Sequence, residues 1–398
     1  MTWAPGRGWL LLLGVCAGLS IWRRPDAVLT PQLWAEDGVV FFLDAWRCGL
    51  SAIAHQYAGY LHVFPRLTAW AASWAPAAYA PHLYAAASLV PPALVCRALA
   101  SPRLPAAPWA RVAMVVPLAL PPMAAEVLFA PSYGHWYLTL LFPLWLASRL
   151  PATPRDMVTD AATLLLAAGS SPAALHLMPL LVVRLAVGRA SGLAWAAVLP
   201  AVLMTAVQAA TLVASGRLQV PGTPGDLIAL AAHAMTGSLI GRWAGDLVLA
   251  RMAPMAALAA GLALVATTAM LAVRRRHWPA AVCAGCALVV WTATIVSMRA
   301  HPGLILADRY HVVPVVLLTW AVVLLQRSWW TAAVATLLVP LAHVGAWRVE
   351  PRPDRHWDTA IACLDREGPC VIPINPDGWA IDMQERLGRR QVVCGPRD

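Results

Sequence analysis

The stretch GLAWAAVLPAVLMTAVQAATLVA, residues 192–214, contains no charged side chain. At about 1.5 Å per residue, a helix over this stretch would be about 35 Å long, enough to cross a hydrocarbon core about 30 Å thick. The stretch also lacks the period-two alternation of membrane β-barrel strands. It therefore predicts a membrane-spanning helix and indicates an all-α fold.

Comparable apolar segments recur along most of the chain. Of the 398 residues, 60% are hydrophobic and only 12% are charged, and the mean hydropathy is +0.65, whereas soluble domains are about 25% charged. We expect a polytopic transmembrane helical bundle of about 11 spans, forming one domain over residues 1–344. The expected spans are 9–22, 79–98, 109–125, 136–150, 158–169, 173–188, 192–214, 254–273, 279–298, 311–326 and 328–344. Several, notably 158–169, are shorter than the roughly 17 residues that a span needs, which allows broken or re-entrant helices there.

The charged residues predict the orientation in the membrane. A cytoplasmic N-terminus satisfies the positive-inside rule, because it puts nearly every short arginine-bearing connection inside. These arginines are Arg97, Arg103, Arg111, Arg149, Arg155, Arg184, Arg189, Arg274, Arg275, Arg276 and Arg327. Most acidic residues then lie outside, namely Glu36, Asp37, Asp44, Glu126, Asp226, Asp246 and Asp308, with Asp156 and Asp160 inside. We expect a multi-pass protein of the bacterial inner (plasma) membrane with an uncleaved first helix and its chemistry on the extracytoplasmic face.

The net charge of +10 does not indicate a nucleic-acid partner. The arginines lie singly in loops, apart from the run Arg274–Arg276. Such scattering is typical of membrane topology and does not form a binding face, so no nucleic acid is expected.

Three of the outer segments are long. In the first, residues 23–78, prolines and aromatic residues predict short helices at the membrane interface. The second, residues 215–253, continues as an amphipathic run, and both segments are expected to cap an outer cavity. The third is an extracytoplasmic tail, residues 345–398, which is too small to bury a sufficient core alone. We expect it to pack on the outer face.

The cysteines and histidines contain no metal-ligand motif. Cys283 and Cys286 have CxxC spacing, but they lie in an apolar helix and are interpreted as small core residues. In an oxidising compartment Cys363 and Cys370 could close a short loop, which would leave Cys394 or Cys48 unpaired. His55, His62, His135 and His311 fall near the outer face, where interfacial hydrogen bonding is the better interpretation.

The segment WAEDGVVFFLDAW, residues 34–46, places Glu36, Asp37 and Asp44 in the first outer loop. An ordinary solvated loop is the alternative interpretation. However, the apolar run that follows would hold Glu36 and Asp37 at the bilayer interface, where desolvation raises the pKa of a carboxyl and suits it to act as a base. Asp37 is the first candidate for the catalytic residue and Glu36 the second.

Three further segments carry candidate substrate-binding residues. In QYAGYLHVFPRL, residues 56–67, Tyr60 and Arg66 are candidates. The guanidinium of Arg66 matches phosphate oxygens, although interfacial anchoring explains both residues equally well. In PSYGHWYL, residues 131–138, His135 stands out beside an aromatic wall. In LADRYHVVP, residues 306–314, Asp308, Arg309 and Tyr310 lie at the outer end of a late span. Charges so close to hydrocarbon are expected to face protein or a wet cavity, although a plain ion pair is the alternative.

Together, the acidic pair of the first loop, the many spans, the aromatic and arginine-bearing outer loops and the late DRY segment resemble the GT-C superfamily of polytopic glycosyltransferases. The resemblance covers the layout of residues 1–344 and rests on short motifs. It implies a donor sugar on a polyprenyl phosphate or pyrophosphate, a glycan or lipid acceptor, and an acidic residue of the first outer loop that acts on the acceptor. Asp37 or Glu36 would be that residue; many members carry Asp-Glu or an Asp-x-Asp-like arrangement, so the order here leaves open which one is the base. No motif carries over Arg66 or Arg309, which we propose for the lipid phosphate from the chemistry of arginine.

The alternative function is a transporter or flippase of a lipid-linked or anionic substrate. It predicts paired half-repeats and ionisable residues near the bilayer midplane, neither of which is evident in the sequence. No cofactor is certain. A divalent metal ion held by Asp37 and donor phosphates is compatible with the sequence, although no dedicated ligand set is present.

Overall fold

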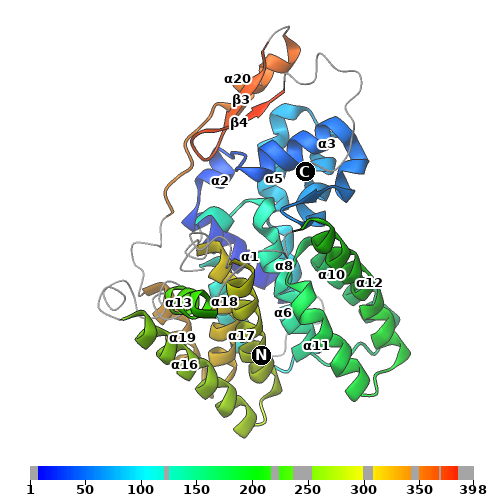
Figure 1. Ribbon diagram of the computed structural model, residues 1–398. Coiled ribbons are helices and arrows are strands. Elements are labelled where there is room, and N and C mark those ends of the chain that lie inside the picture. Colours follow the sequence, from blue (N-terminus) through cyan, green and yellow to red (C-terminus); the bar gives the residue numbers. More distant parts are fainter. Residues whose placement is uncertain are drawn as a thin grey trace.

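The computed structural model describes residues 8–120, 125–216, 224–235, 253–298, 308–341, 349–366 and 369–383. They form a predominantly helical protein (Figure 1). The α-helices are α1 Gly8–Arg23, α2 Asp26–Leu29, α3 Leu43–Cys48, α4 Val63–Ala72, α5 Ala80–Ala87, α6 Val90–Ala100, α7 Pro108–Ala119, α8 Gly134–Thr139, α9 Leu141–Ala147, α10 Pro154–Ser170, α11 Ala174–Val187, α12 Gly192–Ala214, α13 Pro224–Met235, α16 Pro254–Arg274, α17 Trp278–Met298, α18 Val312–Leu324, α19 Trp329–Leu341 and α20 Trp357–Ala360. A π-helical segment covers Asp37–Phe42, and short 3-10 turns cover Gly49–Ala54, Ala77–Tyr79, Ala125–Val127, Pro131–Tyr133, Asp308–His311 and Ile361–Asp365. The strands are β1 Gln56–Tyr57, β2 Tyr60–Leu61, β3 Val371–Ile374 and β4 Trp379–Asp382.

The predicted apolar segments coincide with helices. Within the described residues, four helices are long and apolar enough to cross a membrane: Ala77–Ala100, Gly192–Ala214, Pro254–Arg274 and Trp278–Ser297. Shorter apolar helices occupy Gly8–Arg23, Pro108–Ala119, Ala174–Val187 and Arg309–Leu324. The chain is therefore helical, and its apolar helices are compatible with a membrane protein.

Local sequence explains where several helices begin and break. Pro108, Pro154 and Pro254 each stand at the first residue of a helix, where the missing N–H is not needed. The Thr153 hydroxyl oxygen accepts a hydrogen bond from the backbone N–H of Asp156 at 3.1 Å, which caps the start of α10. This start makes α10 longer than the expected segment 158–169, whereas the expected span 136–150 is divided into α8 and α9.

The apolar core of the bundle is centred on α18, whose side chains are buried along almost the whole helix. The indole N–H of Trp320, in the middle of α18, donates to the Met114 carbonyl oxygen at 2.7 Å and so ties α18 to α7. Cys283 and Cys286 are buried and free within the same core, as their interpretation as small core residues requires.

Arginines predicted to be cytoplasmic lie at one end of the bundle, where several of them bind carbonyl or carboxylate oxygens. Arg103 forms two hydrogen bonds with the Asp160 carboxylate, at 2.9 and 2.7 Å. Arg184 donates to the carbonyl oxygens of Trp145 and Leu146 at 2.6 Å each. This end lies opposite the first loop and the tail in Figure 1.

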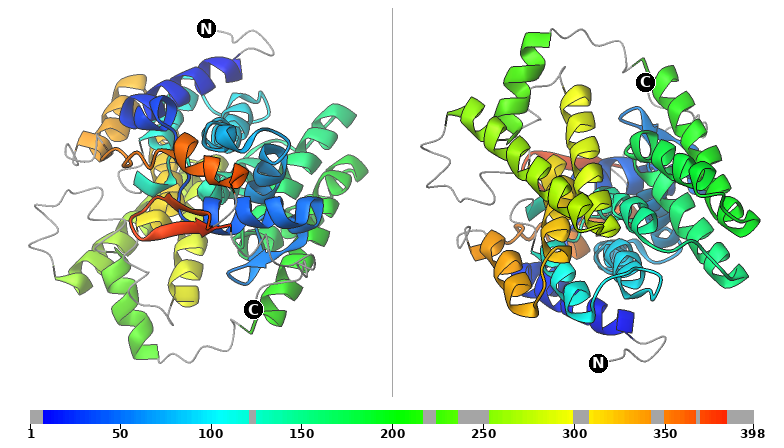
Figure 2. Two further views of the ribbon diagram at one scale, coloured as in Figure 1. Left: turned by 90° about the horizontal axis from the view of Figure 1, so that it is seen from above. Right: turned by 90° about the horizontal axis from the view of Figure 1, so that it is seen from below.

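At the other end, the first loop and the tail form one shared core. Phe41 and Phe42 of the first loop are buried together with Trp357, Ile372 and Ile381 of the tail. Viewed from above, the tail lies across the first-loop segments (left view of Figure 2). The tail therefore packs as expected for a segment too small for its own core. The β1–β2 and β3–β4 hairpins were not predicted from the sequence.

The tail also contacts the backbone of the acidic loop. The Ala35 N–H donates to the Asn375 carbonyl oxygen at 2.5 Å, and the Asn375 N–H donates to the Leu33 carbonyl oxygen at 3.3 Å. Gly38 lies so close to β3 and β4 that a Cβ atom there would be 2.6 Å from Ile374 Cδ1 and 3.0 Å from Ile381 Cδ1. A side chain at this position would therefore displace the side chains of Ile374 and Ile381.

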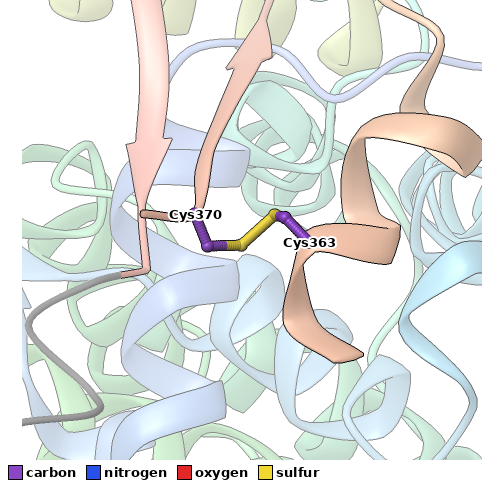
Figure 3. The surroundings of a disulfide bond; sticks show 2 residues. All are labelled: Cys363 and Cys370. Carbon is purple, nitrogen blue, oxygen red and sulfur yellow. A yellow bond between two sulfur atoms is a disulfide. The ribbon is translucent and has the colours of Figure 1, made fainter. Parts of the chain in front are cut away.

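A disulfide between Cys363 and Cys370 joins the 3-10 turn after α20 to the start of β3 (Figure 3). The bond closes the short loop expected from the sequence. Cys48 is also disulfide-bonded, so the alternative that leaves Cys48 unpaired is wrong; Cys394 lies outside the described residues.

Replacing Gly38 with valine should separate the tail from the first loop. The added methyl groups would overlap Ile374 and Ile381, and overpacking of this kind typically costs about 1–3 kcal/mol. We expect faster proteolysis of residues 349–383 in the purified Gly38→Val protein. Gly18→Ala is the control, because a Cβ atom at Gly18 meets nothing within 4 Å. Unchanged cleavage in Gly38→Val would contradict the close packing.

Candidate active site

The turn that presents Glu36 and Asp37 has a strained backbone. Ala35 has a φ of +41°, in the left-handed region that costs a non-glycine residue roughly 1–2 kcal/mol. Asp37 then begins the π-helical segment Asp37–Phe42, a geometry that recurs at functional sites. The tail stabilises this turn through the hydrogen bond from Ala35 to Asn375.

The carboxyl of Asp37 is buried, with 1% of the residue exposed. Its Oδ1 atom accepts a hydrogen bond from the Ser132 backbone N–H at 2.8 Å. Burial raises the pKa of Asp37 from 3.8 to about 8, and the neighbouring Glu36 adds to the rise. The Ser132 N–H and the positive charge of Arg352 oppose it. The pKa of this carboxyl therefore lies near neutral pH, where a group can both hold and release a proton.

Ser132, whose backbone N–H binds Asp37, also binds His135. The Nδ1 atom of His135 lies 2.9 Å from the Ser132 carbonyl oxygen, which accepts a hydrogen bond from the Nδ1–H tautomer. Burial lowers the pKa of His135 to about 4, so the imidazole is neutral at pH 7. Its Nε2 atom is then a hydrogen-bond acceptor.

Histidine and aromatic rings extend from the β1–β2 hairpin to the start of α18. The rings of Tyr60 and His62 are stacked at 3.9 Å, and His62 lies 6.2 Å from His135 in an edge-to-face arrangement. On the other side of His135, the Trp136 ring contacts Tyr310 at 5.5 Å. The structure thus brings Tyr60, His135 and Tyr310 into one ring cluster, although they come from distant parts of the chain.

A second group of charges surrounds Tyr133. Arg309 Nη1 lies 2.9 and 3.0 Å from the two carboxylate oxygens of Glu126. The Tyr133 hydroxyl lies 3.5 Å from an oxygen of Glu126 and 3.5 Å from an oxygen of Glu36. The Arg309 guanidinium also lies 5.7 Å from the Tyr133 ring centre and 5.1 Å from that of Tyr310. Arg309 remains partly exposed, with 22% of its side chain accessible.

Arg352 is a site residue that was not predicted from the sequence. It comes from the tail and is buried, with its guanidinium 4.6 Å from the ring centre of Trp34. It donates to the carbonyl oxygens of Leu128 at 3.2 Å and Phe129 at 3.3 Å, and its backbone N–H donates to Asp26 at 3.1 Å. Burial lowers the pKa of Arg352 to about 9, while Asp37 and Asp26 oppose the shift. The only sequence signal was its place between two prolines, Pro351 and Pro353.

Arg66 contacts the first loop, whereas Arg309 binds Glu126. Its side chain is completely buried, and Nη1 is 3.1 Å from an Asp44 carboxylate oxygen. The guanidinium is also 5.2 Å from the ring centre of Phe41. Burial lowers the pKa of the neighbouring His62, and Arg66 contributes to that shift. Arg66 is thus paired with Asp44 inside the first-loop core.

Of the predicted residues, Glu36, Asp37, His135, Arg309, Tyr310 and Tyr60 lie in one connected region. Asp308 begins the 3-10 turn before α18, but its side chain lies outside the described residues. Within the described parts of the chain, no three His, Cys, Asp or Glu residues are grouped so that they could hold a metal ion.

No protein-family model matches this chain, and no curated protein or solved structure matches it. The site is therefore interpreted from its own residues. It combines a buried carboxyl of raised pKa, a neutral imidazole and a partly exposed arginine, groups that can accept a proton, form hydrogen bonds to a ligand and contact an anion.

The raised pKa of Asp37 predicts how stability depends on pH. Between the unfolded value near 4 and the folded value of about 8, the folded protein retains a proton that the unfolded chain loses. The contribution of Asp37 to stability therefore falls as pH rises through this range and is constant above it. Asp37→Asn cannot titrate, so its melting temperature relative to wild type should rise from pH 4.5 to 8.5. Asp358→Asn, at an exposed position, is the control; a pH-independent difference for Asp37→Asn would exclude the raised pKa.

Arg352 should determine the upper limit of the pH range over which ionisation of Asp37 changes the stability of the protein. Because its charge stabilises the ionised form of Asp37, Arg352→Met should raise the pKa of Asp37 above about 8. The change in stability caused by Asp37→Asn, measured in the Arg352→Met background, should then continue to vary up to a higher pH. Arg352→Lys retains the positive charge and should shift the range less. If Asp37→Asn changes stability over the same pH range in the Arg352→Met background as in wild type, Arg352 does not affect the pKa of Asp37.

Proposed function

We propose that this protein is a membrane glycosyltransferase of the GT-C type, which transfers a sugar from a polyprenyl-phosphate donor to an extracytoplasmic glycan or lipid acceptor. The observation that carries the proposal is the buried Asp37 carboxyl, whose pKa of about 8 lies near physiological pH. A general base is most effective when its pKa is close to the working pH. Its place in the first outer loop agrees with the resemblance to this superfamily.

In the proposed reaction, the Asp37 carboxylate accepts the proton of an acceptor hydroxyl. The acceptor oxygen forms a bond to the anomeric carbon of the donor sugar. The bond between that carbon and the phosphate oxygen breaks, and the electron pair leaves with the lipid phosphate. Glu36 is the second candidate for the base, since it lies next to Asp37 and within 3.5 Å of the Tyr133 hydroxyl.

Arg309 is the proposed contact for the donor phosphate. It is partly exposed, and its Nη1 atom already binds Glu126, which leaves Nε and Nη2 to donate to phosphate oxygens. Tyr310, Tyr60 and His135 are the proposed contacts for the sugar and acceptor, and Asp308 stays a candidate from the sequence. Arg66 was also proposed for the phosphate; its burial beside Asp44 favours a role in shaping the first loop, so Arg309 ranks above it.

The proposed topology has about 11 spans in the bacterial inner membrane, with the N-terminus in the cytoplasm and the site outside. The separation of the arginine-rich end from the Asp37 end supports this arrangement. A divalent metal ion beside Asp37 remains compatible with the donor chemistry, but no step of the proposed reaction uses one.

The transporter or flippase is the second candidate function. A translocation path needs ionisable side chains near the bilayer midplane. The span-length helices Gly192–Ala214 and Trp278–Ser297 contain no charged residue, Pro254–Arg274 contains only its terminal arginine, and Ala77–Ala100 contains only Arg97, close to its end. These helices therefore favour the enzyme.

Asp37→Asn should lower the rate of sugar transfer by about 10²–10⁴, the usual contribution of a general base, without lowering the amount of folded protein. The measurement is sugar transfer from a synthetic polyprenyl-phosphate donor by the purified protein. Glu36→Gln should have a smaller effect, and Asp358→Asn is the control for a lost surface carboxyl. The wild-type rate should rise as pH approaches 8. Full activity in Asp37→Asn would show that Asp37 is not the general base.

A further inference from the structure

A cavity of about 220 Å³ lies at the arginine-rich end of the bundle, away from Asp37. It is an open cavity bordered by the start of α7 and the segment before it, the turn between α16 and α17, and the end of α18. Its polar and aromatic lining residues are Trp109, Arg275, His277, Gln326 and Arg327. In Figure 1, the α16–α17 turn is at the opposite end of the molecule from the tail.

The charges of this cavity are all of one sign. Arg275 and Arg327 line it, and no aspartate or glutamate is among its lining residues. Two guanidinium groups repel each other at such a place unless solvent or an anion compensates their charge. Another arginine at this end of the bundle is neutralised, because Arg103 forms an ion pair with Asp160. The lining of the cavity is therefore suited to an anion.

Hydrogen bonds hold two of the lining side chains in place. Arg275 Nη1 donates to the Leu325 carbonyl oxygen at 2.8 Å, which fixes the guanidinium beside the end of α18 and leaves its other N–H groups as donors. The Ala280 backbone N–H donates to His277 Nδ1 at 3.4 Å, so the ring proton is on Nε2. Burial lowers the pKa of His277, which therefore adds a neutral donor.

We propose that this cavity binds the phosphate of an anionic phospholipid headgroup. Arginine forks match phosphate oxygens, and basic pockets between membrane helices on the cytoplasmic side bind such headgroups. The volume suits a headgroup with one phosphate, because pockets for larger ligands are usually about 300–1,000 Å³.

The apolar surface beside the cavity favours a lipid over a free phosphate ion. Val273 is 68% exposed and Trp278 is 56% exposed, on the two helices that meet at the α16–α17 turn. An acyl chain can lie against these side chains while its headgroup occupies the cavity. Tryptophan side chains such as Trp109 and Trp278 are enriched at the membrane–water interface.

The test is lipid binding to the purified full-length protein, measured by native mass spectrometry from a neutral detergent. Phosphatidylglycerol, phosphatidylcholine and inorganic phosphate are the probes. We expect phosphatidylglycerol to bind more tightly than the other two, and its affinity to fall about tenfold or more in Arg275→Gln/Arg327→Gln. Arg327→Gln alone should give a smaller loss, and it leaves the hydrogen bond from Arg275 to Leu325 intact. It therefore remains informative if the double variant does not fold.

The matched control is Arg274→Gln/Arg276→Gln, which removes two charges from the same turn outside the cavity lining. It should change the affinity for phosphatidylglycerol by less than about twofold. If the control lost as much affinity as Arg275→Gln/Arg327→Gln, the binding would depend on general surface charge, and the proposal would be overturned. Binding of inorganic phosphate as tightly as phosphatidylglycerol would replace the lipid with a free anion. Unchanged binding in Arg327→Gln and in the double variant would exclude the cavity as the site.

Discussion

The buried guanidinium of Arg352 is the interaction on which the site most depends. A positive charge can remain inside a protein only if oxygen atoms surround it, and here the carbonyls of Leu128 and Phe129 meet that need. The same loop carries Ser132, whose N–H binds Asp37 and whose carbonyl oxygen binds His135. One side chain from the tail thereby fixes the loop that orients both groups, and its charge also lowers the pKa of the Asp37 carboxyl.

Hydropathy located most of the long helices, since a long apolar run without charges has few alternatives to a buried or membrane helix, but it did not predict the division of 136–150 into α8 and α9. The acidic turn at Glu36 and Asp37 was also evident, because carboxylates are costly beside apolar segments. Arg352 and Ser132 could not be predicted in the same way. Their roles depend on contacts between segments far apart in sequence, and Ser132 acts through backbone atoms that every residue possesses. The short β1–β2 and β3–β4 hairpins lacked a clear alternating pattern.

Arg66 and Arg309 show why residue type is not enough to identify a phosphate contact. Both are arginines near aromatic side chains, in segments predicted to lie outside the membrane. Arg66 is enclosed with Asp44 in the first-loop core, whereas Arg309 shares Glu126 and keeps part of its side chain exposed. Exposure decides whether a guanidinium can exchange its present contacts for a ligand, and only the fold determines exposure. The sequence indicated the chemistry that an arginine offers but could not rank these two residues.

A phosphate near the site would act on Asp37 through charge. An added anion raises the pKa of a neighbouring carboxyl, and Asp37 already titrates near pH 8. A proposed base in this position would remain protonated unless positive charge offset the phosphate. Arg352 lies close enough to Asp37 to lower its pKa, and Arg309 lies beside Glu126, the carboxylate that contacts the same tyrosine as Glu36. The two arginines are thus placed to compensate different negative charges. If the donor phosphate binds Arg309 as proposed, Arg352 remains available to keep the Asp37 carboxyl able to ionise.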